Sequence, residues 1–312
     1  MNIVIIGNGK MASDCIAIIS KQKEHVITGV LLEESKNPSP AVLFQTIEQN
    51  HLPVFYLNNV NDIGSLNFIQ TAQPDWIMNI NCYQYLKEPL LAIPKKGTIN
   101  FHNGPLPQYG GVHISSWPII NGEKSHGVTW HMVNSGIDTG DILSQVHFEI
   151  SDQMTAAALM VKCIEQGIGL FEEFWLQWIE GVITPKPQVG IRSYYSKKDK
   201  APNGGELDWK LPAKTLHNLI RGLLLFPYPN EFAFAHFFTQ GEKWHVIQSD
   251  FNEDNSGEIS GTILACNPQS FIVQCGHGQL KIKMLATHDL KPIKMSKWTE
   301  QYGIQSGSVL GL

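Results

Sequence analysis

The strongest constraint on the fold is an apolar strand at the start of the chain that runs directly into a glycine turn. Residues 2–6 read Asn-Ile-Val-Ile-Ile, as expected for a parallel strand that is buried on both faces. Gly7 and Gly9 then open a turn into a helical stretch from Lys10 to about Ser20. Further apolar runs follow at 25–32, 54–57, 75–80 and 97–101. Strands that alternate with helices at this spacing predict an open α/β sheet.

The same turn matches a dinucleotide-binding fingerprint. Gly7-x-Gly9-x-x-Ala12 fits G-x-G-x-x-G/A, and Glu33 stands about where a ribose-binding acid would. One interpretation is therefore an NAD-dependent oxidoreductase. However, any tight strand-to-helix turn favours glycine. We interpret the turn as structural, because the rest of the chain gives no support for redox chemistry.

The pattern of the chain changes after Gly111. Alternating residues at 127–133 and 142–150 predict two strands, and a long helix follows from about 154 to 180. Residues 197–206 are polar with Pro and Gly and predict a linker, which leads to a short helix at about 213–225. Four short strand-like runs come next, at 244–248, 261–265, 271–275 and 280–284. This second pattern predicts a small β-barrel domain at the C-terminal end.

Two polar clusters carry the candidate chemistry. Asn100 and His102 are two residues apart at the end of a predicted strand, so both side chains point to one face. They are expected at the carboxyl edge of the sheet, where open α/β folds bind ligands. Asp138 lies in a glycine-framed loop between two predicted strands. An amide, an imidazole and a carboxylate suit acyl transfer without a covalent nucleophile, because they can stabilise an oxyanion and move a proton.

Three motifs around these residues resemble a known family. They are Ile-Asn-Phe-His-Asn-Gly-Pro-Leu-Pro at 99–107, His-Gly-Val-Thr-Trp-His-Met at 126–132, and Gly-Ile-Asp-Thr-Gly-Asp-Ile-Leu at 136–143. In this order they resemble the folate-dependent formyltransferases, of which methionyl-tRNA formyltransferase is the best known. The resemblance continues at 206–209 and 261–264 and so covers nearly the whole chain.

The resemblance implies a fold, a co-substrate and a set of site residues. The fold is α/β: a Rossmann-like formyltransferase domain over residues 1–200, followed by a smaller OB-like β-barrel domain over residues 201–312. The implied reaction transfers the formyl group of 10-formyltetrahydrofolate to an amine, with Asn100, His102 and Asp138 as catalytic residues and no metal. The implied folate-binding residues come from two loops: Cys82, Tyr83, Gln84 and Tyr85, and Gly104, Pro105, Leu106 and Pro107.

Other polar residues near the motifs are expected to be structural. His113, His126 and His131 lie close to the catalytic motifs in the sequence, and we assign them supporting roles. Lys197, Lys198 and Lys200 are expected to form a solvated surface, although an anionic substrate could also use them.

The charge of the chain bears on which amine accepts the formyl group. The net charge is −5, and the region 31–40 carries one lysine against two glutamates, where tRNA enzymes of this family carry a basic insertion. The Arg that usually follows the proline motif is replaced by Gly110. Binding of tRNA requires clustered Lys and Arg side chains. We therefore do not expect tRNA to be the acceptor.

Two other groups of related enzymes suggest which amine is the acceptor. We favour an amino acid or a carrier-bound aminoacyl group, as in the formylating units of peptide-assembly enzymes; an amino-sugar nucleotide is the alternative. The segment 306–310 (Ser-Gly-Ser-Val-Leu) would suit a boundary to such an enzyme. Five widely spaced cysteines and the lack of a leader or a long apolar segment predict a soluble protein of the cytoplasm with no membrane partner.

Overall fold

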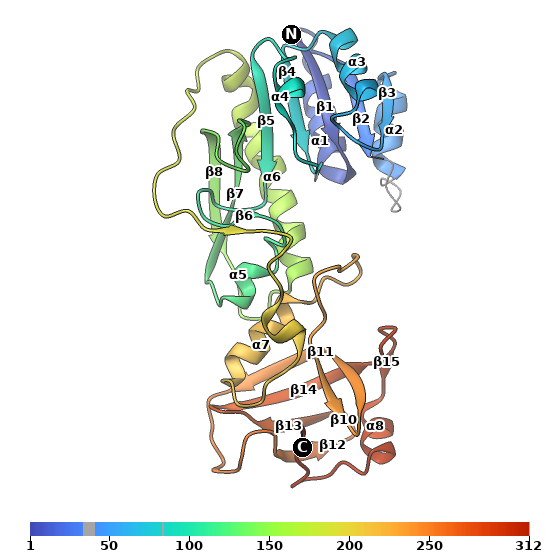
Figure 1. Ribbon diagram of the computed structural model, residues 1–312, viewed down its shortest axis with the longest axis vertical. Coiled ribbons are helices and arrows are strands. Elements are labelled where there is room, and N and C mark those ends of the chain that lie inside the picture. The colour runs from blue at the N-terminus through green and yellow to red at the C-terminus, as the bar shows by residue number, and fades with distance from the viewer. Residues whose placement is uncertain (34–40, 83, 312) are drawn as a thin grey trace. The chain divides into compact units, whose positions relative to one another are not determined.

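The computed structural model describes residues 1–33, 41–82 and 84–311 (Figure 1). Tyr83 and most of the region 31–40 therefore lie outside the described residues. The chain forms two compact units, of which the first comprises residues 1–111, 126–148 and 162–194. The second comprises residues 112–125, 149–161 and 195–312. The chain thus enters the second unit at three places along the sequence. The last of these, at Tyr195, lies close to the expected boundary at residue 200.

The first unit is built on a seven-stranded sheet with the order β3-β2-β1-β4-β5-β7-β8. The pairs from β3 to β5 are parallel, and β5 pairs with β7 in the antiparallel sense. The bounds are β1 (Asn2–Gly7), β2 (Val26–Glu33), β3 (Val54–Leu57), β4 (Trp76–Ile80), β5 (Gly97–His102), β7 (Ser125–Met132) and β8 (Ile142–Glu149). The predicted α/β sheet is confirmed, and the ends of β4 and β5 lie side by side because these parallel strands share one register.

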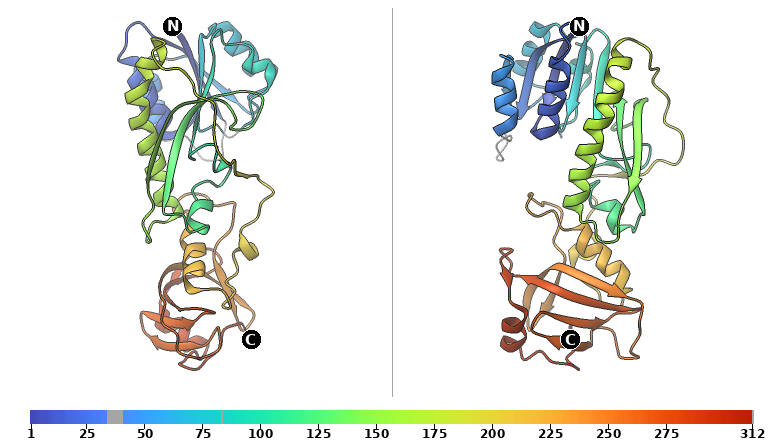
Figure 2. Two further views of the ribbon diagram at one scale, coloured as in Figure 1. Left: turned by 90° about the vertical axis from the view of Figure 1, so that its left-hand side faces the viewer. Right: turned by 180° about the vertical axis from the view of Figure 1, so that it is seen from behind.

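Helices cover both faces of this sheet. In the left panel of Figure 2, α1 and α6 lie on one side of the sheet and α3 lies on the other. The bounds of the helices are α1 (Gly9–Ser20), α2 (Ala41–Gln49), α3 (Ile63–Ala72), α4 (Glu88–Leu91) and α6 (Ala156–Ile179). A short two-stranded ribbon joins β6 (Gly110–Gly111) to β9 (Tyr194–Tyr195). The central strands β1 and β4 are therefore buried on both faces, which explains their continuous apolar runs.

The glycine turn after β1 has a packing reason. A Cβ atom on Gly7 would lie 1.9 Å from the carbonyl oxygen of Ile80 on the neighbouring strand. Gly9 begins α1 with φ +77, in the left-handed region that favours glycine. Close contact of the backbones of β1 and β4 thus accounts for the first glycine without any bound nucleotide.

The second unit has an antiparallel sheet with the path β10-β11-β14-β13-β12, and β15 pairs with β14. Its elements are α5 (Trp117–Ile120), η1 (Pro202–Gly205), α7 (Ala213–Gly222), β10 (His236–Thr239), β11 (Glu242–Asn252), β12 (Ile263–Asn267), β13 (Ser270–Gln274), β14 (Gln279–Ala286), β15 (Pro292–Ile293) and α8 (Met295–Gln301). Leu216, Phe271 and Trp298 lie in its own hydrophobic core. The expected fold class, an α/β domain followed by a smaller β domain, is confirmed.

Several short elements were not predicted from the sequence. The helices α2, α3 and α8 and the strand β10 are absent from the sequence-based assignment, whereas the long helix was predicted to within two residues at its start and one at its end. Short helices leave few turns in which a 3.6-residue period can be recognised. Within the part of the chain that the structure describes, no helix has the length and apolar character needed to cross a membrane.

We predict opposite effects on stability for two glycines of α6. A Cβ atom on Gly167 would lie 2.3 Å from the ring of Phe101, whereas one on Gly169 would meet nothing within 4 Å. Gly167→Ala should lower the free energy of unfolding by about 1–3 kcal/mol through overpacking. Gly169→Ala should raise it by about 0.5–1 kcal/mol through helix propensity and reduced chain entropy. Denaturant titration of both variants checks this, and equal effects would refute the packing argument.

Candidate active site

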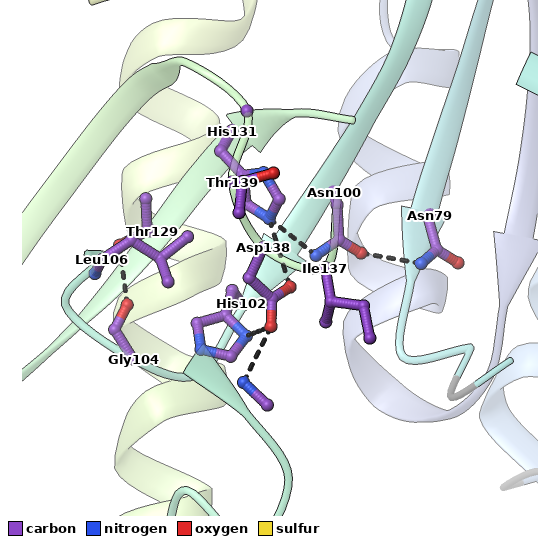
Figure 3. A network of polar contacts seen from close by, with 12 residues as sticks. Asn79, Asn100, His102, Gly104, Leu106, Thr129, His131, Ile137, Asp138 and Thr139 are labelled. Carbon is purple, nitrogen blue, oxygen red and sulfur yellow. Dashed lines mark hydrogen bonds and ion pairs between the residues drawn. The ribbon is translucent and has the colours of Figure 1, made fainter. Parts of the chain in front are cut away.

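Three polar side chains form a row across the neighbouring strands β4, β5 and β7. The parallel register places Asn79 beside Asn100, and the antiparallel register places Asn100 beside His131. Figure 3 shows these side chains pointing towards one another across the sheet. Asn79 and His131 are buried, and Asn100 is half-buried. We refer to Asn79, Asn100 and His131 as the polar row.

The hydrogen bonds within the polar row all run from donor to acceptor in the same direction, from Asn79 to His131. Asn79 Nδ2 donates to Asn100 Oδ1 over 2.7 Å, and Asn100 Nδ2 lies 3.0 Å from His131 Nε2. His131 Nδ1 lies 2.7 Å from the carbonyl oxygen of Met132, which can only accept. Nδ1 therefore carries the proton, and the Nε2 of a neutral His131 accepts from the amide of Asn100.

His102 and Asp138 lie beside this row. His102 Nε2 is 2.7 Å from the carbonyl oxygen of Tyr109, so that Nε2 carries a proton and donates it. Asp138 Oδ2 is 3.6 Å from His102 Nδ1, and Asp138 Oδ1 is 3.7 Å from His131 Nε2. Both distances are longer than hydrogen bonds, and each contact is an ion pair only when its imidazole is protonated. The structure thus brings Asn100, His102 and Asp138 together around His131.

Asp138 lies in the loop between β7 and β8 and is held there by hydrogen bonds from residues outside this loop. Asp138 has φ +53, a conformation uncommon outside glycine. Its Oδ2 accepts a hydrogen bond from the backbone N–H of Gly111 over 2.8 Å, and its carbonyl oxygen accepts one from Gln188 Nε2 over 2.9 Å. A Cβ atom on Gly140 would lie 1.7 Å from the carbonyl oxygen of Met132. The glycine behind Asp138 is therefore needed for the loop to fold back against β7.

Burial sets the electrostatics of the polar row. Burial lowers the pKa of His131 from 6.5 to about 4, although the charge of Asp138 acts in the opposite direction. A proton on His102 would lower the pKa of His131 further. At neutral pH His131 is therefore uncharged, which agrees with the acceptor role of its Nε2.

The first expected folate-binding loop makes contacts mainly with its own neighbours. Cys82 is buried, and burial together with Glu33 raises the pKa of its thiol to about 12. The side chain of Gln84 accepts from the backbone N–H of Val60 and donates to the carbonyl oxygen of Asn58. The hydroxyl of Tyr85 donates to the carbonyl oxygen of Ser135, in the loop that also carries Asp138.

The second expected loop lies against β7. Gly104, Pro105 and Leu106 are buried, and Pro107 is half-buried. Thr129 Oγ1 donates to the carbonyl oxygen of Gly104 over 2.7 Å and accepts from the backbone N–H of Leu106 over 3.2 Å. One hydroxyl on β7 therefore holds this loop next to His102.

Sequence reasoning missed two members of the site. Asn79 was taken as part of an apolar run, and His131 was given a structural role without a partner. Cross-strand register brings both to Asn100, and this register links residues far apart in the chain. Among the residues that the structure describes, no group of three or more His, Cys, Asp or Glu side chains could hold a metal ion.

Two family models match the chain. "Formyl transferase" matches residues 1–173, and "Formyl transferase, C-terminal domain" matches residues 200–303. The chain belongs to the formyl transferase family, and the resemblance inferred from the motifs is confirmed. The protein is therefore an enzyme of the formyl-transferring class rather than an oxidoreductase.

Individual relatives cover most of the chain. Methionyl-tRNA formyltransferase from Clostridium novyi (strain NT) is 33% identical over 243 residues, which are 78% of this chain and 76% of that protein. Methionyl-tRNA formyltransferase from Clostridium beijerinckii (strain ATCC 51743 / NCIMB 8052) is 28% identical over 99% of this chain and 100% of that one. An N-formyltransferase from Helicobacter canadensis, solved with folinic acid and dTDP-3-aminofucose, shares the fold with a TM-score of 0.66. It is 21% identical, and the match covers 90% of this chain and 98% of that one.

The buried histidines predict a loss of stability in mild acid. Burial lowers the pKa of both His126 and His131 to about 4, against about 6.5 in an unfolded chain. Between these values the unfolded chain binds more protons than the folded one, so stability falls as the pH decreases through this window. Each histidine should remove on the order of 1 kcal/mol per pH unit.

Denaturant unfolding between pH 7 and pH 4 measures this slope. His126→Gln, which keeps an N–H donor for the carbonyl oxygen of Asn103, should reduce the slope by about one histidine's share. A slope that is unchanged in this variant would contradict the assignment.

Proposed function

We propose that the enzyme transfers the formyl group of 10-formyltetrahydrofolate to a primary amine at Asn100, His102 and Asp138. The observation that supports this best is the convergence of these three side chains from two separate segments. Asn100 and His102 share one face of β5, and Asp138 reaches them from the β7–β8 loop to within 3.6 Å of His102 Nδ1. Each group has a role in acyl transfer to an amine.

The reaction can be written with these groups in place. The amine nitrogen attacks the formyl carbon, the carbonyl oxygen becomes an oxyanion, and the bond from this carbon to N10 then breaks. The amine loses a proton, N10 gains one, and the products are a formamide and tetrahydrofolate. One N–H of Asn100 is used by His131, and the second is directed to the oxyanion. His102 Nδ1 moves the proton, because its Nε2 is held by the carbonyl oxygen of Tyr109.

The folate would be held by the two loops that the sequence indicated. Because the side chains of Cys82 and Gln84 are engaged with neighbouring residues, we assign recognition of the pteridine mainly to backbone groups of this loop. The loop Gly104–Pro107 follows His102 directly and would place the N10 formyl group over the catalytic residues. The Helicobacter canadensis relative was solved with folinic acid, a formylated folate, which supports this choice of donor.

For the acceptor we propose an amino acid or a carrier-bound aminoacyl group rather than tRNA. The net charge is −5, and residues 201–312 carry nine Lys and Arg against ten Asp and Glu. Binding of an acceptor stem relies on clustered positive charge. The two Clostridium relatives described above are methionyl-tRNA formyltransferases, so methionyl-tRNA is the competing acceptor. Amino-sugar nucleotides are the third class to test.

An acceptor screen tests the proposed function directly. The enzyme is incubated with 10-formyltetrahydrofolate and with amino acids, aminoacyl carrier proteins, dTDP-amino sugars or methionyl-tRNA, and products are analysed by mass spectrometry. We expect a mass gain of one formyl group on an amino acid or aminoacyl carrier protein, and none on methionyl-tRNA. Formylation of tRNA alone would overturn the acceptor proposal, and formylation of no amine would overturn the function.

Substitution of the three residues tests their roles. Asn100→Ala should lower kcat by about 10²–10³-fold through loss of an oxyanion donor. His102→Ala and Asp138→Asn should lower it by about 10²–10⁴-fold through loss of proton transfer. Asp141→Asn is the matched control, because Asp141 is an exposed acid of the same loop and should keep kcat unchanged. Wild-type turnover in any of the three site variants, with normal folding by circular dichroism, would refute the assignment.

A further inference from the structure

We propose that Asn79 is a positioning residue that, together with His131, fixes the direction of the Asn100 side-chain amide so that one of its N–H groups faces the reacting carbonyl. This inference rests on the proposed function and adds a residue to it. Asn79 would act only through Asn100.

A group outside the polar row sets the orientation of the side-chain amide of Asn79. Its Nδ2 lies 2.7 Å from Asn100 Oδ1 and 3.4 Å from the carbonyl oxygen of Cys82. A backbone carbonyl can only accept, so the NH₂ end of Asn79 must face this side. Asn79 then offers a donor to Asn100, and the oxygen of the Asn100 amide is the group that meets it.

At the other end of the polar row, a backbone carbonyl likewise decides which ring nitrogen of His131 carries the proton. The carbonyl oxygen of Met132 accepts a hydrogen bond from the N–H at Nδ1. The proton of the neutral ring is therefore on Nδ1, and Nε2 has a lone pair. His131 then offers an acceptor to Asn100, and the NH₂ end of the amide is the group that meets it. Two backbone carbonyls thus define the row from opposite ends and give the same orientation of Asn100.

A flipped amide would be opposed at both contacts. Turned over, Asn100 would place its NH₂ group against the NH₂ group of Asn79 and its oxygen against the lone pair of His131 Nε2. Asn79 and His131 are 7% and 2% exposed, so water cannot readily replace the lost hydrogen bonds. The second N–H of Asn100 is therefore held in one direction before substrate binds, as a preorganised oxyanion donor requires.

The local sequence also favours this role over a packing role. The strand β4 is buried at all five positions, and Asn79 is its only polar residue. A buried amide in a central strand is costly unless its hydrogen bonds are made. The Nδ2 of Asn79 is bonded to Asn100, whereas its buried Oδ1 has no hydrogen-bond partner among the described residues. An aliphatic residue would fill the same space without this cost. The amide at this position is explained by its bond to Asn100.

Two substitutions separate positioning from packing. Asn79→Leu keeps the approximate volume and removes the donor, and kcat should fall by roughly 10–10²-fold because the donor is misplaced. KM for 10-formyltetrahydrofolate should change little. Asn79→Asp presents an acceptor instead of a donor, which favours the flipped amide, and kcat should fall at least as far. Thr98→Val is the matched control, because Thr98 is a buried polar residue on β5 outside the polar row, and it should retain kcat.

Histidine NMR gives a readout that a packing defect would not produce. In wild-type protein labelled with ¹⁵N-histidine, His131 should be neutral with its proton on Nδ1. In Asn79→Asp the flipped oxygen of Asn100 would face Nε2, so His131 should gain a proton there and titrate at higher pH than in the wild type. A wild-type His131 that is charged or protonated on Nε2 would overturn the inference even if every variant fails to fold.

The outcomes distinguish this inference from the proposed function. If the wild-type enzyme formylates no amine, the proposed function fails, while the NMR experiment still decides the orientation of the amide. If the wild type is active but Asn79→Leu and Asn79→Asp keep its kcat, only the positioning role fails. An equal loss of kcat in Thr98→Val would show general sensitivity of the sheet and would also overturn the positioning role.

Discussion

The antiparallel pairing of β5 with β7 is the interaction on which the site depends. It places Asn100 opposite His131 and His102 opposite Thr129, so each candidate catalytic residue on β5 has a partner on β7. The chain then turns after β7 and brings Asp138 back to both imidazoles. The parallel strands β3 to β5 alone would provide no strand on the other side of β5 to carry His131 and Thr129. The change of strand direction at β7 therefore creates the site.

Burial gives this site its electrostatic character. In a low-dielectric environment a hydrogen bond is stronger and an unmade one is more costly, so a row of buried polar groups adopts a single arrangement. His131 stays neutral because burial lowers its pKa to about 4, and it can therefore accept a hydrogen bond. Asp138, whose side chain is 13% exposed, is the nearby carboxylate. An uncharged imidazole and an acidic side chain thus lie side by side.

The same site geometry leaves the acceptor open. In the proposed reaction the site acts on the formyl carbon of the donor and on an amine nitrogen of the acceptor. Such a nitrogen is common to amino acids, aminoacyl groups, amino sugars and aminoacyl-tRNA. Discrimination must come from surfaces that contact the rest of the acceptor. The balanced charge of residues 201–312 is the physical reason for preferring an acceptor that is not a polyanion.

The sequence by itself determined the open α/β sheet, the second β domain and the family, because apolar runs and contiguous motifs are local. It also placed Asn100 and His102 on one face, since side chains two residues apart on a strand share a face. Only the tertiary structure revealed the roles of Asn79, the one polar residue of the buried strand β4, and of His131, one of several polar residues on β7. Their role depends on which residues lie opposite one another on neighbouring strands, and that register is a long-range property set by packing of the whole sheet.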